Sequence, residues 1–349
     1  MFVMDQNKRI ISFDVMRVVA AYAVVFQHIG GQNWTEVFPS ADWEIRNIYV
    51  SFAQWSVPVF FMISGALFLS PDKQVYIKRL FGKNLLRIVY AFLFWSAIYE
   101  LYSIGQDTSL KVALLSMLKG PVHFWFLKVM IGIYLFLPVL KSVVGNRQAF
   151  RYLVMFSVIT TFVVSPIFVH VGLFREQWTT LLKDYYDGFG ILSLEFISYF
   201  VLGYFLYSSS FGKRIKYFIY LLGIVGLVGS ALCTHVCSHY LGYTYGYFYD
   251  DLHPFVMLVA VAVFVYAKEH CKAYSPSVRR VIVELSNYSL GIYLVHPLFM
   301  FGLNDYFSIN SSTFNSVFSI PVLATLIFIL SYLLVKVVSY IPYLKKTVI

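Results

Sequence analysis

The sequence is poor in charged residues and in cysteine. Only 13% of its 349 residues are charged, whereas 59% are hydrophobic, and the chain has three cysteines. This composition excludes an ordinary water-soluble domain and indicates a membrane protein with several spans. Three cysteines cannot form a disulfide framework, and they do not fix the redox compartment.

Motifs of several large enzyme classes are also missing. The sequence contains no Walker phosphate loop, no G-x-G-x-x-G after a strand, no G-x-S-x-G and no H-E-x-x-H. We therefore do not expect coupling to nucleotide hydrolysis. Residues 1–9 are mostly polar, and no small-residue cleavage site follows the apolar stretch after them. That stretch is expected to remain as a membrane span rather than be removed as a signal peptide.

Ten apolar segments of the sequence are long enough to cross a bilayer. We predict an all-α, polytopic membrane protein that forms a single domain over residues 1–349 and has no internal repeat. The segments cover approximately residues 10–30, 49–70, 83–104, 124–143, 150–172, 190–208, 215–237, 254–268, 283–303 and 317–340.

Lysine and arginine residues mark the orientation of these segments. If the N-terminus is cytoplasmic, twenty of these residues lie on the cytoplasmic side and five, Arg46 among them, on the outer side. Cytoplasmic loops carry the excess of Lys and Arg in membrane proteins, so the asymmetry predicts this orientation, with both termini cytoplasmic. The net charge of +10 thus follows the membrane topology, and no nucleic-acid partner is expected.

The first apolar segment carries the strongest functional signal. It contains Asp14, Arg17 and His28, and ionisable groups at membrane depth are costly and usually functional. Asp14 lies three residues before Arg17 and can pair with it. Eleven residues separate Arg17 from His28, about three helical turns, so both share one face roughly 16 Å apart along the axis. The alternative, a structural ion pair and a packing histidine, stays open.

The third segment begins with a basic ladder and ends with a carboxylate. Arg79, Lys83 and Arg87 are spaced four apart, and arginine binds phosphate through two parallel hydrogen bonds, so the ladder is a candidate phosphate clamp. Its alternative is the ordinary cytoplasmic excess of basic residues. Glu100 is expected at the depth of His28, where it either orients that histidine and raises its basicity or reaches the outer water.

Two further histidines lie at or within apolar segments. His123 and Trp125 precede the fourth segment at the outer interface, where aromatic residues are common. Lys128 follows, and it either snorkels outward or faces a cavity. His296 lies within the ninth segment, directly before Pro297, and the alternative to a functional role is a satisfied core histidine at a proline kink.

The end of the seventh segment reads C-T-H-V-C-S-H. Cys233 and Cys237 are four apart, as are His235 and His239, and zinc ligands have such spacings. The two pairs point to different faces of one helix, however, so a compact site with all four ligands is geometrically poor. No metal is expected.

The motifs of the chain, taken in order, resemble those of the integral-membrane acyltransferase 3 family. The first segment has a D-x-x-R start at Arg17, followed by ten residues and His28. The stretch V-P-V-F-F-M-I-S-G-A-L-F-L, which contains Ser64, resembles the second helix of that family. The basic run that leads to Arg87 resembles the entry of its third helix.

The resemblance continues in the second half of the chain. H-F-W-F-L at His123, with I-Y-L-x-x-P downstream, is similar to the fourth-helix motif of the family, and G-I-Y-L-V-H-P-L around His296 resembles its late histidine helix. Lys128 and Met130 replace the acidic character that some members have in the fourth helix, so no Glu role carries over there. Within the family, the likeness is greatest to O-acetyltransferases of enterobacterial common antigen and of exopolysaccharides.

This resemblance implies a function and a set of partners. Members transfer an acyl group, usually acetyl, from a cytoplasmic coenzyme A thioester to a carbohydrate hydroxyl. The resemblance therefore implies acetyl-CoA as donor, a polysaccharide or lipid-linked glycan as acceptor, and a place among the lipids of the bacterial cytoplasmic (inner) membrane. Arg17 and His28 correspond to the essential pair of the family.

The resulting hypothesis assigns catalysis to His28 and Glu100, and binding of the donor to Arg17, Arg79 and Arg87. Substrate binding is assigned to Asp14, Ser64, His123, Trp125 and His296. The sequence leaves open whether the catalytic histidine acts as a general base or becomes acylated. The alternative function is a transporter or flippase for a lipid-linked glycan, although no repeat symmetry or pair of broken helices supports it.

Overall fold

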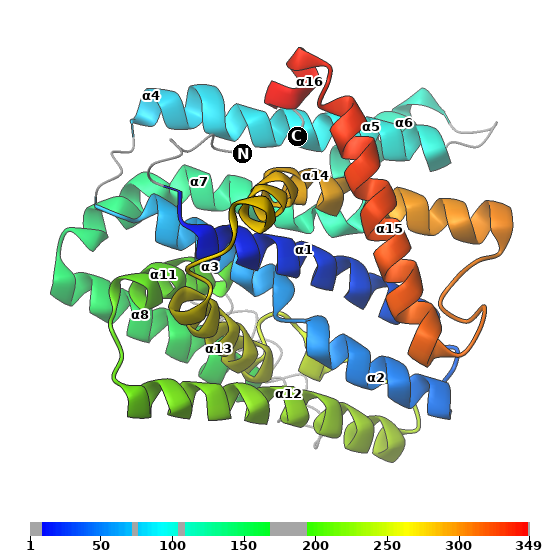
Figure 1. The fold of residues 1–349 in the computed structure, drawn as a ribbon, viewed down its shortest axis with the longest axis horizontal. Helices are drawn as coiled ribbons and strands as arrows, with labels where there is room; N and C mark the ends of the chain where they lie inside the picture. The colour runs from blue at the N-terminus through cyan, green and yellow to red at the C-terminus, as the bar shows by residue number, and fades with distance from the viewer. Residues whose placement is uncertain (1–8, 72–75, 104–108, 168–193, 348–349) are drawn as a thin grey trace. The chain divides into compact units, whose positions relative to one another are not determined.

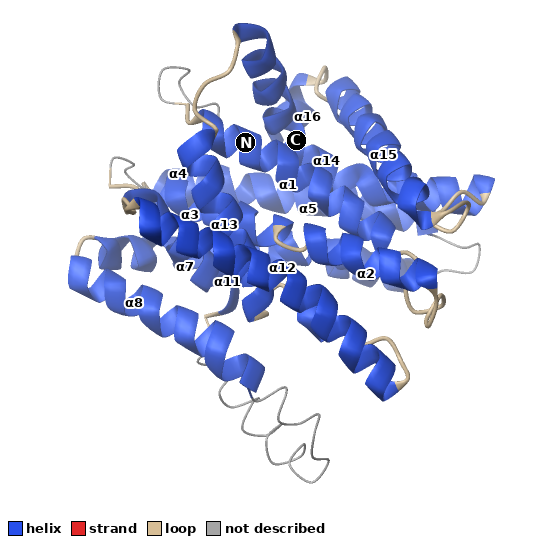
Figure 2. Cartoon of the chain, turned by 60° about the horizontal axis from the view of Figure 1, so that its bottom comes forward, coloured by secondary structure: helices blue, strands red, loops and turns tan. Residues whose placement is uncertain are grey.

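The structure is a computed structural model of the chain, and it describes residues 9–71, 76–103, 109–167 and 194–347. These residues form α-helices joined by loops, with short 3₁₀ and π-helical turns, and none of the residues in these ranges lies in a β-strand (Figure 2). The predicted all-α fold is therefore confirmed.

Eight helical segments are long and apolar enough to cross a membrane, which confirms a polytopic membrane protein. Every predicted apolar segment falls mainly on helix as far as it is described, although the second is divided between two helices by a turn at residues 54–55 and the tenth ends in a turn at residues 339–340. The sixth falls on α11 (Glu195–Ser208), with residues 190–193 outside the described part, and the ninth lies within α14 (Pro276–Phe307). The eight are Ile11–Gly30, Ala41–Phe68, Ile77–Ser103, Val122–Val144, Arg147–Ile167, Lys213–Leu241, Tyr247–His270 and Ser316–Val338. The orientation of the termini stays a prediction.

The chain divides into two compact units, each assembled from stretches that are far apart in the sequence. Ile10–Lys73 and Ser142–Tyr274 form one, which we call the His28 unit. Met1–Arg9, Gln74–Lys141 and Ser275–Ile349 form the other, the His296 unit. The chain passes between the units four times, so neither is a continuous stretch of sequence. The single domain expected over residues 1–349 stays a prediction.

In the His28 unit, the first helix packs against α2, α3 and α13 (Figure 1). The helical elements described in this unit are α1 (Ile11–Gly30), α2 (Ala41–Ala53), α3 (Ser56–Phe68), α8 (Arg147–Ile159), the π-helical η4 (Thr160–Val164), α11, α12 (Lys213–Leu241), the 3₁₀ turn η5 (Tyr247–Tyr249) and α13 (Pro254–His270).

In the His296 unit, α14 packs against both α15 and α5. The helical elements described in this unit are α4 (Ile77–Arg79), the π-helical η2 (Leu80–Leu85), α5 (Leu86–Ser103), α6 (Leu110–Lys119), the 3₁₀ turn η3 (Val122–Phe124), α7 (Trp125–Val144), α14, α15 (Ser316–Val338) and α16 (Pro342–Thr347).

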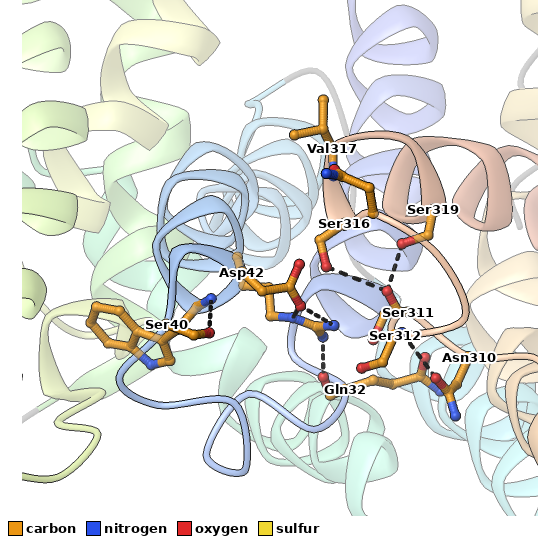
Figure 3. Close-up of polar contacts among 12 residues, drawn as sticks. Gln32, Ser40, Asp42, Asn310, Ser311, Ser312, Ser316, Val317 and Ser319 are labelled. Carbon is orange, nitrogen blue, oxygen red and sulfur yellow. Dashed lines mark hydrogen bonds and ion pairs between the residues drawn. The ribbon is translucent and has the colours of Figure 1, made fainter.

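Local sequence sets the ends of the long helices. Pro276 occupies the first turn of α14, where its missing N–H costs nothing, and the side chain of the preceding Ser275 caps that turn. Helix α12 stops at Gly242, whose φ of 75° places it in the left-handed region that favours glycine. The turn between α14 and α15 is closed by Ser316 and Ser319, whose hydroxyls donate to the Ser311 carbonyl at 3.4 and 2.5 Å (Figure 3).

The core of the His28 unit depends on a close crossing of α3 and α11 at two glycines. A Cβ atom on Gly65 would lie 1.7 Å from the Phe200 carbonyl oxygen, and one on Gly203 would lie 2.1 Å from that of Met62. The two helix backbones therefore touch, as small residues allow in membrane interfaces. This crossing fixes α3, which packs against the helix that carries His28.

We predict that Gly65→Ala and Gly203→Ala lower the unfolding temperature of the detergent-purified protein, because either methyl group forces the two backbones apart. The expected cost is about 1–3 kcal/mol or more. Gly132→Ala on α7 is the matched control, since a Cβ there meets nothing within 4 Å. Thermal unfolding followed by size-exclusion chromatography measures the effect. Equal unfolding temperatures for all three variants would contradict the crossing.

Candidate active site

Helix α1 holds the ion pair predicted from the sequence. Nη1 of Arg17 lies 3.7 Å from Oδ1 of Asp14. The carboxylate of Asp14 is almost fully buried, and the Arg17 side chain is 22% exposed. A buried carboxylate is costly unless it has a charged partner, so Asp14 holds Arg17 in place. Part of the Arg17 side chain remains exposed.

His28 lies in the last turn of α1 and is half-buried. Its Nδ1 is 2.7 Å from the backbone carbonyl oxygen of Val24. A carbonyl oxygen only accepts hydrogen bonds, so Nδ1 carries the proton, and the lone pair of the neutral ring is on Nε2. The hydrogen bond thus adds to the sequence hypothesis by identifying the ring nitrogen that can act as a base.

The loop that follows His28 is anchored by a buried arginine. Arg46 of α2 is fully buried and donates from Nη1 to the Gln32 carbonyl, while its Nε and Nη2 lie 3.2 and 3.1 Å from Oδ2 of Asp42 (Figure 3). These contacts compensate for burying the charge. The sequence interpretation counted Arg46 among ordinary outer-loop residues, because no local pattern shows that it reaches back to Gln32.

Ser64 lies on α3, one position before the glycine of the α3–α11 crossing. It is half-buried, and its hydroxyl donates to the Phe60 carbonyl of the same helix at 2.8 Å. The hydroxyl oxygen keeps acceptor capacity after that bond. Its predicted role in substrate binding stays a prediction.

In the His296 unit, the two predicted histidines come together. The ring centroids of His123 and His296 are 5.9 Å apart, although the residues are far apart in the sequence. Both are buried. Nδ1 of His296 is 2.7 Å from the Tyr293 carbonyl oxygen, so its proton is also on Nδ1 and the lone pair of its neutral ring is on Nε2.

Two tyrosines that the sequence hypothesis did not include join this cluster. The hydroxyl of Tyr99 on α5 donates to the Leu294 carbonyl at 2.9 Å, and that of Tyr293 donates to the His123 carbonyl. The Tyr99 ring also meets the His123 ring edge-on at 5.1 Å. Tyr293 precedes His296 by one helical turn, which is a spacing that could have identified it. The pairing of Tyr99 with Leu294 has no comparable signal in the sequence.

The basic ladder differs in burial along its length. Arg79 and Lys83 are exposed, whereas Arg87 is half-buried at the start of α5. The π-helical η2 lies between Arg79 and Arg87, and such turns are frequent at functional sites. Arg87 is therefore the member of the ladder that reaches toward the interior, while the other two suit either a phosphate or the cytoplasmic charge excess.

The remaining predicted residues lie singly in the same unit. Glu100 and Trp125 are both half-buried, on α5 and at the start of α7. Lys128 is exposed, and its ammonium donates to the Lys119 carbonyl at 2.9 Å, so it points outward rather than into a cavity. Because Glu100 belongs to the His296 unit, its predicted pairing with His28 stays a prediction.

A family model described as an acyltransferase domain matches residues 10–336, which takes in both units. The chain belongs to the acyltransferase 3 family. The family that its motifs indicate is thereby confirmed, and the protein is a multi-pass membrane acyltransferase. Neither a curated protein nor a solved structure matches the chain. The likeness to particular O-acetyltransferases and the roles of single residues stay predictions.

We predict that Tyr99→Phe destabilises this acyltransferase by about 0.5–1.5 kcal/mol, because it removes a buried hydrogen bond to the Leu294 carbonyl that water cannot replace. Tyr102→Phe is the matched control: it lies on the same helix and bonds the exposed Asp305 of α14 at 2.8 Å, where water can replace the hydroxyl. Thermal unfolding of the purified proteins measures both changes. A larger loss for Tyr102→Phe than for Tyr99→Phe would contradict this account of the cluster.

Proposed function

We propose that the protein is an O-acyltransferase that moves an acetyl or similar acyl group from cytoplasmic acyl-CoA to a hydroxyl of a cell-surface or lipid-linked polysaccharide. Membership of the acyltransferase 3 family supports the reaction class. The observation that carries the mechanism is the 2.7 Å hydrogen bond from His28 Nδ1 to the Val24 carbonyl, which leaves Nε2 as the basic atom. We place the protein in the bacterial inner membrane.

In this proposal His28 acts as a general base. Nε2 removes the proton of the acceptor hydroxyl as the hydroxyl oxygen attacks the thioester carbonyl carbon. The tetrahedral intermediate then collapses, the carbon–sulfur bond breaks, and the thiolate of coenzyme A takes the proton from the imidazolium. Such proton transfer contributes about 10²–10⁴-fold to a rate. The variant route, in which Nε2 itself attacks and an acyl-histidine forms, uses the same nitrogen.

Arg17 is proposed to hold an anionic part of the donor. It lies eleven residues before His28 on the same helix, about 16 Å along the axis, and its side chain is partly exposed. Coenzyme A is a long ligand with phosphates at one end and the thioester at the other, so this separation suits it. Asp14 then serves as a positioning residue for Arg17. Arg79 and Arg87 remain predicted phosphate ligands.

The remaining predicted residues are proposed to serve the acceptor. Hydroxyl, imidazole and indole groups such as those of Ser64, His123, Trp125 and His296 make hydrogen bonds to sugar hydroxyls. The Val24 carbonyl already fixes the Nδ1 proton of His28, which is the orienting role that the sequence hypothesis gave to Glu100. The proposed mechanism therefore assigns no step to Glu100.

Transfer of labelled acetyl from acetyl-CoA, supplied at the cytoplasmic face of inverted vesicles that contain native glycolipids, tests the proposal. We expect label on glycolipid with the wild type and at least about 100-fold less with His28→Gln. His270→Gln is the matched control, since His270 makes the same bond to the carbonyl four residues earlier, Tyr266, but lies exposed at the end of α13. Equal transfer by His28→Gln and wild type would rule out His28 as the base.

A second prediction separates donor binding by Arg17 from a purely structural ion pair. The double variant Asp14→Asn/Arg17→Met removes both charges and leaves neither buried alone. We expect its KM for acetyl-CoA to rise about 10- to 100-fold, the loss of one charge-assisted hydrogen bond, while the enzyme stays folded. Arg147→Met, at an exposed arginine of α8, is the control. An unchanged KM in the folded double variant would make the pair structural only.

A further inference from the structure

Helices α2 and α12 of the His28 unit lie side by side (Figure 1). Two histidines and one carboxylate converge where they meet. His235 and His239 lie four residues apart near the end of α12 and therefore share one face. Glu44 reaches them from the first turn of α2. Its Oε1 is 2.7 Å from Nδ1 of His235 and 3.0 Å from Nε2 of His239.

The three potential ligand atoms of this cluster meet at one point. Oε1, Nδ1 and Nε2 all lie within 4.8 Å of one another. Two histidines on successive turns of one helix together with one carboxylate are a recurrent zinc ligand set, with the remaining position taken by water. A metal ion seated between the three atoms replaces the two N–H protons that now point at the carboxylate.

The surroundings suit a metal that comes from solution. The two histidine side chains are each 44% exposed and Glu44 is 35% exposed, so an ion can reach the ligand atoms. The ring of His239 is fixed by Phe38 and Trp43, whose centroids lie 5.2 and 5.8 Å away. Because the ring is already held in place, His239 loses less side-chain entropy when it binds a metal ion.

The thiols of the same helix are not needed. His235 and His239 share the face that Glu44 meets, whereas the neighbouring cysteines, two positions away, point elsewhere on the helix. The sequence interpretation rejected a metal because it sought four ligands on α12. The third ligand comes from α2, nearly two hundred residues earlier, and no spacing in the sequence indicates it.

We propose that Glu44, His235 and His239 bind one divalent transition-metal ion, with Zn²⁺ as the natural occupant, and that this ion clips α2 to α12. Helix α2 also carries Arg46, which anchors the loop after α1. The clip therefore stabilises the part of the His28 unit from which that loop is held. The proposal does not depend on the acyl-transfer reaction, because it is tested by Zn²⁺ binding and by the unfolding temperature of the protein.

The test uses the untagged full-length protein in detergent, first stripped with a chelator and then titrated with ZnCl₂ by calorimetry. We expect one ion per chain and a Zn²⁺-dependent rise of the unfolding temperature, since a ligand that binds only the folded state stabilises it. Glu44→Gln, His235→Ala and His239→Ala should each weaken binding at least about 10- to 100-fold. Each variant is first shown to match the unfolding temperature of the metal-free wild type.

Two controls make the result specific. The double variant Cys233→Ser/Cys237→Ser and the variant His270→Ala should bind Zn²⁺ as the wild type does. Co²⁺ in place of zinc should give visible d–d absorption without a thiolate charge-transfer band. If a site variant fails to fold, the Co²⁺ spectrum of the wild type still decides the ligand type. Absence of stoichiometric binding, loss of binding in the cysteine variant, or a thiolate band would overturn the proposal.

Discussion

A bilayer supplies no water to the polar groups of a spanning helix, so such groups must find partners inside the protein. In this acyltransferase the partners are repeatedly backbone carbonyls of the helices themselves. The Val24 carbonyl accepts a hydrogen bond from His28, the Tyr293 carbonyl accepts one from His296, and the Phe60 carbonyl accepts one from Ser64. These bonds do more than satisfy burial. The two bonds from histidines also place the ring proton on Nδ1, so the lone pair of each neutral ring is on Nε2.

His28 and His296 share this arrangement but differ in what a substrate can reach. His296 is completely buried, beside the rings of His123 and Tyr293. His28 is half-buried and follows a paired but accessible cation on the same helix. A general base must contact the proton that it removes, so accessibility favours His28 for the reaction. His296 is better suited to holding α14 in register with its neighbours.

Local periodicity predicted the features that one helix contains. The apolar segments became helices, and the three-residue spacing of Asp14 and Arg17 became an ion pair. Contacts between distant stretches were not predictable in this way. The burial of Arg46 and the bond from Tyr99 to Leu294 depend on which helices meet, and a single sequence carries no signal for that. The π-helical turn before Arg87 is a further feature that hydrophobic periodicity does not show.

In the proposed mechanism His28 presents a basic Nε2, because the Val24 carbonyl holds the proton on Nδ1. Nitrogen NMR of protein labelled with ¹⁵N at both histidine ring nitrogens tests it directly, with the signals of His28 assigned by their loss in His28→Gln. We expect the neutral ring to show a protonated Nδ1 and an unprotonated Nε2. A neutral His28 with its proton on Nε2 would contradict the account.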